Sequence, residues 1–213
     1  MKKIPKTTLA ILLFIIAFAI TSLVPTQIIT MDRYILNLMF LWIWVISLVV
    51  IFKKNLSEAI AQSSLVVVVI VIACSLALHA GVVYSISSVV QPLRPFDSHG
   101  VSFLLRNNFF TRVKPLDVLN QQLLILLLVK TLERYWMTLQ QITILFLFWF
   151  GAIHIFQIFK ADILMWLAFT VGALLLSCIF PYMILRVKNW YAYNYAIHLG
   201  VYSVAALAAW LLY

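Results

Sequence analysis

Charged side chains are scarce in this sequence, and acidic ones most of all. Asp, Glu, Lys and Arg make up 10% of the 213 residues, and only 6 residues are Asp or Glu. A soluble domain is about 25% charged and about 45–50% apolar. This chain is 65% hydrophobic with a mean hydropathy of +1.09. A chain of this length cannot hide that apolar surface from water, so the sequence excludes an ordinary soluble domain and predicts an integral membrane protein.

Cysteine is also rare, and the excess of cations lies between the apolar runs. Cys74 and Cys178 stand inside apolar runs and are expected to be buried free thiols rather than a disulfide. The net charge of +9 indicates membrane topology and contact with lipid headgroups, which makes the bilayer the first expected partner. Nucleic acid is not an expected partner, because no basic face with base-stacking aromatic residues is present.

Several long, continuous apolar runs approach the roughly 20 residues that a helix needs to cross a bilayer. They predict an all-α, polytopic membrane helix bundle of about seven transmembrane helices, with residues 1–213 forming a single integral membrane domain. The first run follows a cationic segment, as in a signal peptide, but no small-x-small cleavage site follows, so an uncleaved helix is expected. The expected spans are Thr8–Val24, Tyr34–Phe52, Ala61–Tyr84, Val118–Met137, Ile142–Phe159, Ile163–Leu185 and Trp190–Tyr213.

The cations between the spans predict the orientation of the chain. Lys2, Lys3 and Lys6 place the N-terminus in the cytoplasm by the positive-inside rule, and we expect a bacterial-type inner (plasma) membrane. Alternation of the spans puts further cations on the same side: Lys53, Lys54, Lys130, Arg134, Arg186 and Lys188. The connection Ser85–Asp117 is then outside, although it carries four cations. Either it is a structured surface element exempt from the rule, or the number of spans differs by one from the expected seven. Its stretch Val101–Val113 mixes Phe and Leu with Arg, as an interfacial amphipathic helix does.

Polar residues inside these oily spans are the main functional signal. Polar groups are expensive in a membrane and usually face the interior of the bundle, so each is a candidate functional residue. The candidates are Gln121 and Gln122, which follow Asn120, together with His154 and His198; His79 is a further one. We expect the side chains of Gln121 or Gln122, His154 and His198 to converge on one cavity.

The order of these residues resembles the CAAX prenyl endopeptidase and bacteriocin-processing (CPBP, or Abi) intramembrane proteases. That family carries a Glu-Glu pair, then Phe-x-x-x-His, then a histidine followed by Asn or Asp. Here Phe150–His154 matches the second motif, His198 stands at the third, and Phe169–Gly172 matches an F-x-x-G step between them. Gln121-Gln122 lies where the Glu-Glu pair is expected. The resemblance covers residues 115–213 and implies a membrane-embedded endopeptidase fold.

Departures from the family pattern put peptidase activity in doubt. A carboxylate can serve as general base because burial raises its pKa toward neutrality, whereas glutamine has no proton-accepting state. Leu126 stands where the family has Arg, and Tyr202 replaces the Asn or Asp of the third motif. The chain is therefore expected to be a catalytically silent relative that binds a membrane-associated peptide or protein, unless Glu133 reaches inward and supplies the base.

Two other function classes remain open. One is a non-enzymatic membrane partner or scaffold that stabilises other membrane proteins. The other is a haem-binding redox protein, since histidines on facing helices can ligate haem axially, and His79, His154 and His198 are available for this. The sequence names no cofactor. It also shows no Asp or Glu in the apolar centre of any span and no paired broken helices, which disfavours a coupled transporter. Each histidine also has a simpler interpretation, a hydrogen bond between helices.

Overall fold

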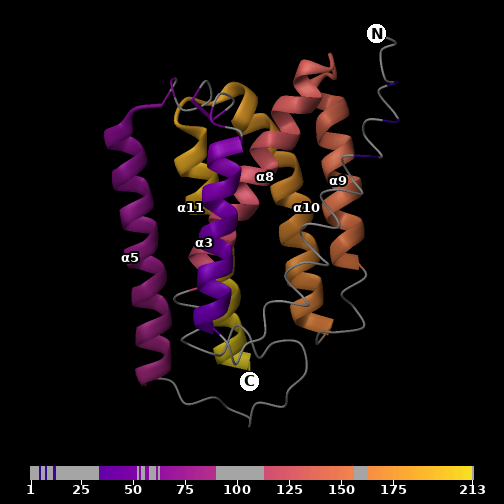
Figure 1. The fold of residues 1–213 in the computed structure, drawn as a ribbon. Coiled ribbons are helices and arrows are strands. Elements are labelled where there is room, and N and C mark those ends of the chain that lie inside the picture. Colours follow the sequence, from indigo (N-terminus) through magenta and orange to yellow (C-terminus); the bar gives the residue numbers. More distant parts are fainter. Residues whose placement is uncertain are drawn as a thin grey trace.

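A computed structural model describes residues 34–51, 63–89, 113–155 and 163–212, together with the single residues 5, 8, 12, 53, 56, 57 and 61 (Figure 1). The expected first span, Thr8–Val24, and the expected interfacial helix, Val101–Val113, lie outside the described residues apart from single positions.

The described part of the chain is almost entirely helical. Its six helices are α3 (Tyr34–Ile51), α5 (Leu65–Val89), α8 (Lys114–Arg134), α9 (Leu139–Ile155), α10 (Ile163–Arg186) and α11 (Trp190–Leu212). Three helical segments among the described residues are long and apolar enough to cross a membrane: Leu65–Ser85, Lys114–Arg134 and Trp166–Arg186. The helical membrane bundle is thus supported, and the full count of seven spans stays a prediction.

The expected span Val118–Met137 is wrong at both ends. The observed α8 begins at Lys114 and ends at Arg134, so its first turn belongs to the helix rather than to the preceding connection. Pro115 favours this start, because proline fits the first helical turn, where its missing N–H is not needed. The helix stops before Trp136, whose backbone is left-handed with φ 64°.

Helix α8 is the central element of the bundle. It packs against α3, α9, α10 and α11. In the most apolar part of its membrane-spanning segment 61% of the residues are buried, compared with 11% in α5 and 33% in α10. Leu126 and Leu132 of α8 are almost fully buried, as are Ile142 and Phe146 of α9. Since its neighbours shield it from lipid, α8 is the helix best placed to carry polar side chains.

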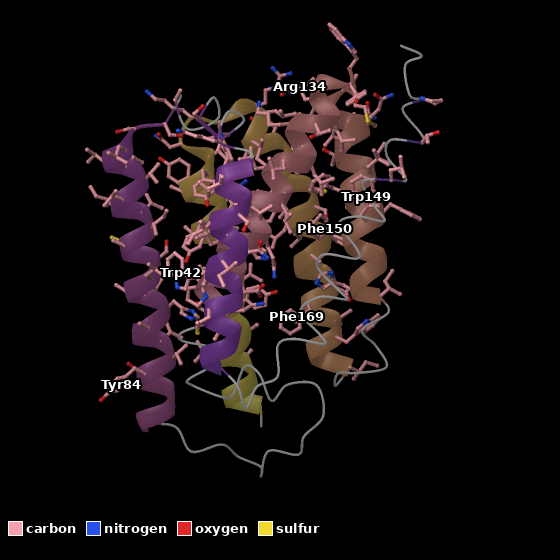
Figure 2. All side chains as sticks on the ribbon, viewed as in Figure 1. Trp42, Tyr84, Arg134, Trp149, Phe150 and Phe169 are labelled. Atoms are coloured by element: carbon pink, nitrogen blue, oxygen red, sulfur yellow. The ribbon has the colours of Figure 1, made fainter. Side chains whose placement is uncertain are left out.

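The helices alternate in direction, which gathers most of the described cations at one end (Figure 1). Helices α8 and α10 end there, with Arg134 and Arg186 as their last residues, and Lys188 follows in the short connection to α11. Arg134 lies at the opposite end of the bundle from Tyr84 of α5 (Figure 2). Lys114 differs from these cations, because it stands at the start of α8.

The cysteines require one correction. Cys74 and Cys178 are free, but both are exposed on the outer surfaces of α5 and α10, so the expectation of buried thiols is wrong. Both side chains lie on helix faces that no other described helix covers, which in a bilayer are faces toward lipid.

Candidate functional site

A hydrogen bond between two helices forms the centre of the candidate site. The side-chain nitrogen Nε2 of Gln122 on α8 lies 2.8 Å from Nδ1 of His198 on α11. Gln122 is 0% exposed and His198 is 8% exposed. Because an amide nitrogen can only donate, Nδ1 of His198 accepts, and a neutral His198 carries its proton on Nε2. The bond fixes both the ring orientation and the tautomer.

The two neighbouring glutamines have different partners. The side chain of Gln121 turns away from His198, and its Nε2 donates to Oδ2 of Asp117 at 3.0 Å within α8. Successive residues of a helix point about 100° apart, so only one glutamine of the pair can face α11. Gln122 is therefore the glutamine that faces His198.

Next to this pair lies an ion pair that the sequence analysis missed. Nζ of Lys114 donates to Oδ2 of Asp117 at 2.7 Å, and the two side chains are 9% and 19% exposed. The same Nζ lies 3.8 Å from the centroid of the Tyr202 ring. The available signal was Lys114 and Asp117 with opposite charges at i,i+3 directly before an apolar run. The first turn of α8 therefore contains both a carboxylate and a cation.

Aromatic rings enclose His198. The ring of Tyr202 stacks on it at a centroid distance of 5.5 Å, and Phe180 of α10 lies at 5.4 Å. Phe169 in turn packs on Tyr202 at 5.9 Å and is labelled in Figure 2. A Cβ added at Gly172 would meet Cγ1 of Val201 at 3.6 Å, so this glycine faces α11. The F-x-x-G step thus brings α10 onto the part of α11 that carries the site.

His154 is nearby but is not hydrogen-bonded to the pair. Its Nδ1 donates to the backbone oxygen of Phe150 at 2.7 Å, within α9, so a neutral His154 keeps an acceptor lone pair on Nε2. The indole N–H of Trp166 donates to the carbonyl oxygens of His154 and Ile155, at 3.0 and 3.2 Å. Of the expected group, Gln122 and His198 meet directly, whereas His154 and Gln121 bond elsewhere.

Several buried polar atoms have no hydrogen-bond partner among the described residues. Both polar side-chain atoms of Asn194 are in this state, as is the carbonyl oxygen Oε1 of Gln122. Asn194 is 0% exposed and precedes His198 by one helical turn on α11. Oδ1 of Asn120 and Oγ1 of Thr170 are further cases. Sequence analysis overlooked Asn194, although an Asn one turn from a candidate histidine in an apolar helix was a visible signal.

Two other polar residues lie away from this site. Nδ1 of His79 on α5 is 2.9 Å from Oγ of Ser203 on α11, so His79 joins α5 to a different part of α11. Glu133 pairs with Lys130 at 2.9 Å and its side chain is 47% exposed. The alternative in which Glu133 reaches inward is therefore wrong, because this glutamate lies in the last turn of α8 and points outward. No group of three or more His, Cys, Asp or Glu that could hold a metal ion occurs in the described ranges.

Comparisons of the chain with protein-family models, with curated proteins and with solved structures found no match.

Proposed function

We propose that this protein is a multi-pass membrane protein, similar to the CPBP endopeptidases, that binds a membrane-associated peptide or protein segment without hydrolysing it. The observation that carries the proposal is the Gln122–His198 hydrogen bond. It sets an amide against the histidine at a place where a glutamate-type peptidase needs a carboxylate.

The carboxylate nearest to the site among the described residues does not replace the missing base. Asp117 is held in an ion pair by Lys114 and accepts a second hydrogen bond from Gln121 on the same oxygen. Both contacts hold Asp117 within the first two turns of α8, and neither involves His198. General-base assistance is typically worth about 10²–10⁴-fold in rate, so its loss leaves a site that favours binding over hydrolysis.

The proposal also states in which membrane the protein lies and which end of the bundle faces the cytoplasm. The end of the bundle that carries Arg134 and Arg186 is assigned to the cytoplasm, in a bacterial-type inner membrane. The N-terminus is then cytoplasmic. The gathering of most described cations at one end supports this assignment.

The test measures whether the purified protein binds a membrane-spanning peptide, detected by cross-linking, and whether it cleaves that peptide. The probe is a synthetic single-span peptide of Leu and Ala, about 24 residues long, with flanking lysines, a central Gly-Pro and one photoreactive diazirine-leucine beside it. The purified wild-type protein in lipid vesicles is expected to cross-link the probe and leave it intact. The double variant Gln122→Leu/His198→Phe removes both partners of the hydrogen bond, so neither is left unpaired. It is expected to remain folded and to capture less.

Two results would contradict the proposal. Absence of capture by the wild type would remove the binding function. Cleavage by the wild type that disappears in His154→Ala would show an active peptidase and would require a base other than a glutamate at positions 121 and 122.

A further inference from the structure

The side chain of Asn194 is unusual because it is fully buried without a partner. It is 0% exposed, and neither its Nδ2 nor its Oδ1 has a hydrogen-bond partner among the described residues. In a bilayer-embedded bundle a buried amide without partners is costly, because neither water nor lipid can replace the missing hydrogen bonds. An apolar residue of similar shape would avoid that cost. A binding role accounts for an amide at this position.

A second group without a partner belongs to Gln122, the hydrogen-bond partner of His198, and His198 lies one helical turn from Asn194. Nε2 of Gln122 is used by His198, but the carbonyl oxygen of the same Gln122 side chain has no described partner. Asn194 and His198 are four residues apart on α11, and residues at that spacing share a helix face. The unpartnered groups of Asn194 and Gln122 are therefore linked through His198, which shares a helix face with Asn194 and is hydrogen-bonded to Gln122.

We propose that Asn194 and the carbonyl oxygen of Gln122 form a subsite for one peptide unit of a membrane-embedded segment. Nδ2 of Asn194 donates to the carbonyl of that unit, and Oε1 of Gln122 accepts from its N–H. This inference rests on the proposed function and adds to it the chemical group that the site recognises.

The subsite selects one class of segment. In a regular transmembrane helix the backbone N–H and C=O groups are already paired within the segment, so they are not available to Asn194. Proline in a helix removes one such hydrogen bond and leaves a carbonyl free. Glycine beside it lets the chain leave the helical conformation, so that the N–H and the C=O of one neighbouring peptide unit both lose their partners. The expected ligand is therefore a membrane segment whose helix is interrupted by Gly or Pro, rather than a continuous helix.

Helix α10 is the element that covers the site. Phe180 is 3% exposed and its ring lies against His198. The next residue, Pro181, stands inside α10 and interrupts the hydrogen-bond ladder of that helix. Helix α10 packs on both α9 and α11, so the proposed subsite requires α10 to bend at Pro181 before a segment can enter between α10 and α11.

The experiment compares Asn194→Leu with the wild type in the photo-cross-linking assay with the Gly-Pro peptide. Loss of hydrogen bonding to the peptide unit is expected to reduce capture about tenfold or more. The unfolding temperature of the free protein should be unchanged or higher, since the variant removes two unpaired buried atoms. Ser177→Ala is the control. It removes a buried hydroxyl of α10 that is bonded to the backbone oxygen of Ala173 within its own helix, and it should leave capture unchanged.

A second measurement leaves the protein unaltered. In an ester analogue of the probe, one backbone N–H beside the Gly-Pro pair is replaced by oxygen, and wild-type capture of it should fall severalfold. Continuous Leu-Ala peptide should also be captured less than the Gly-Pro peptide.

Capture of the Gly-Pro peptide that is unchanged by Asn194→Leu or by the ester would overturn the subsite while leaving the proposed binding function intact. A lower unfolding temperature for Asn194→Leu together with undiminished capture of the ester would assign Asn194 to structure alone. Failure of the wild type to capture any peptide would instead reject the proposed function.

Discussion

A lysine buried in an apolar bundle is stable only if its charge has a partner. The charge of Lys114 lies 2.7 Å from the carboxylate of Asp117 and 3.8 Å from the centroid of the Tyr202 ring. Asp117 also accepts a hydrogen bond from Gln121. A protonated amine over an aromatic face gains additional electrostatic attraction when it is desolvated. These contacts connect the first turn of α8 to α11 and support the position of His198 through Tyr202.

The first prediction concerns this ion pair. Asp117→Asn leaves the Lys114 charge buried without its carboxylate and is expected to cost about 3 kcal/mol of stability. Lys114→Met/Asp117→Asn removes both charges and should recover most of that loss, because the amide oxygen introduced at position 117 can still accept from Gln121. Thermal unfolding in detergent would measure both variants. A double variant as unstable as Asp117→Asn would show that the charge itself is not responsible.

At the scale of elements, α5 packs chiefly on a single neighbour among the described helices. That neighbour is α11, and the contact contains the buried hydrogen bond between His79 and Ser203. Oγ of Ser203 also donates to the backbone oxygen of Leu199 at 2.9 Å, so Nδ1 of His79 is the donor in the first bond. His79 was a candidate functional residue in the sequence, and in the structure it links two helices.

The second prediction tests that link with a double-mutant cycle. His79→Leu and Ser203→Ala should be coupled by about 0.6 kcal/mol, the average for hydrogen bonds between membrane helices. Ser75→Ala serves as the control for α5, because Oγ of Ser75 bonds to Val71 within its own helix. Its effect should add to that of His79→Leu. Unfolding free energies in mixed micelles provide the measurement, and additivity of His79→Leu with Ser203→Ala would contradict the link.

Across the whole molecule, the alternating directions of the helices agree with the gathering of most described cations at one end of the bundle. From α8 to α11, successive helices run in opposite directions (Figure 1). The start of α9 lies at the same end as Arg134, and the end of α11 lies at the other. With one further span before α3, the two termini would be on opposite sides of the membrane.

The third prediction is that topology. Reporter fusions placed after Lys54 and at Tyr213 should report opposite sides, with Lys54 in the cytoplasm. Alkaline phosphatase and green fluorescent protein fusions provide complementary readouts, since each is active on a different side of a bacterial inner membrane. Activity of the same reporter at both positions would require an even number of spans between Lys54 and the C-terminus and would refute the expected count.

The amino-acid sequence determined the helical segments and the location of several polar residues. Bilayer thickness sets the length of an apolar run, and Trp190 was correctly expected as a helix start. The first turn of α8 was missed because Lys114 and Asp117, taken one by one, are typical of a loop. Their charges cancel in an i,i+3 pair, which allows a polar turn to continue an apolar helix.

Tertiary structure decided which of these polar residues meet. The sequence specifies no rotation or crossing angle for a helix, since both depend on packing against neighbours. Packing turned Gln122 rather than Gln121 toward His198, left His154 bonded to its own helix, and directed Glu133 outward. It also enclosed Asn194 without a described partner. The sequence by itself thus determined a membrane helix bundle with polar residues in its interior, and the mutual packing of α8, α10 and α11 decided which of them form a site.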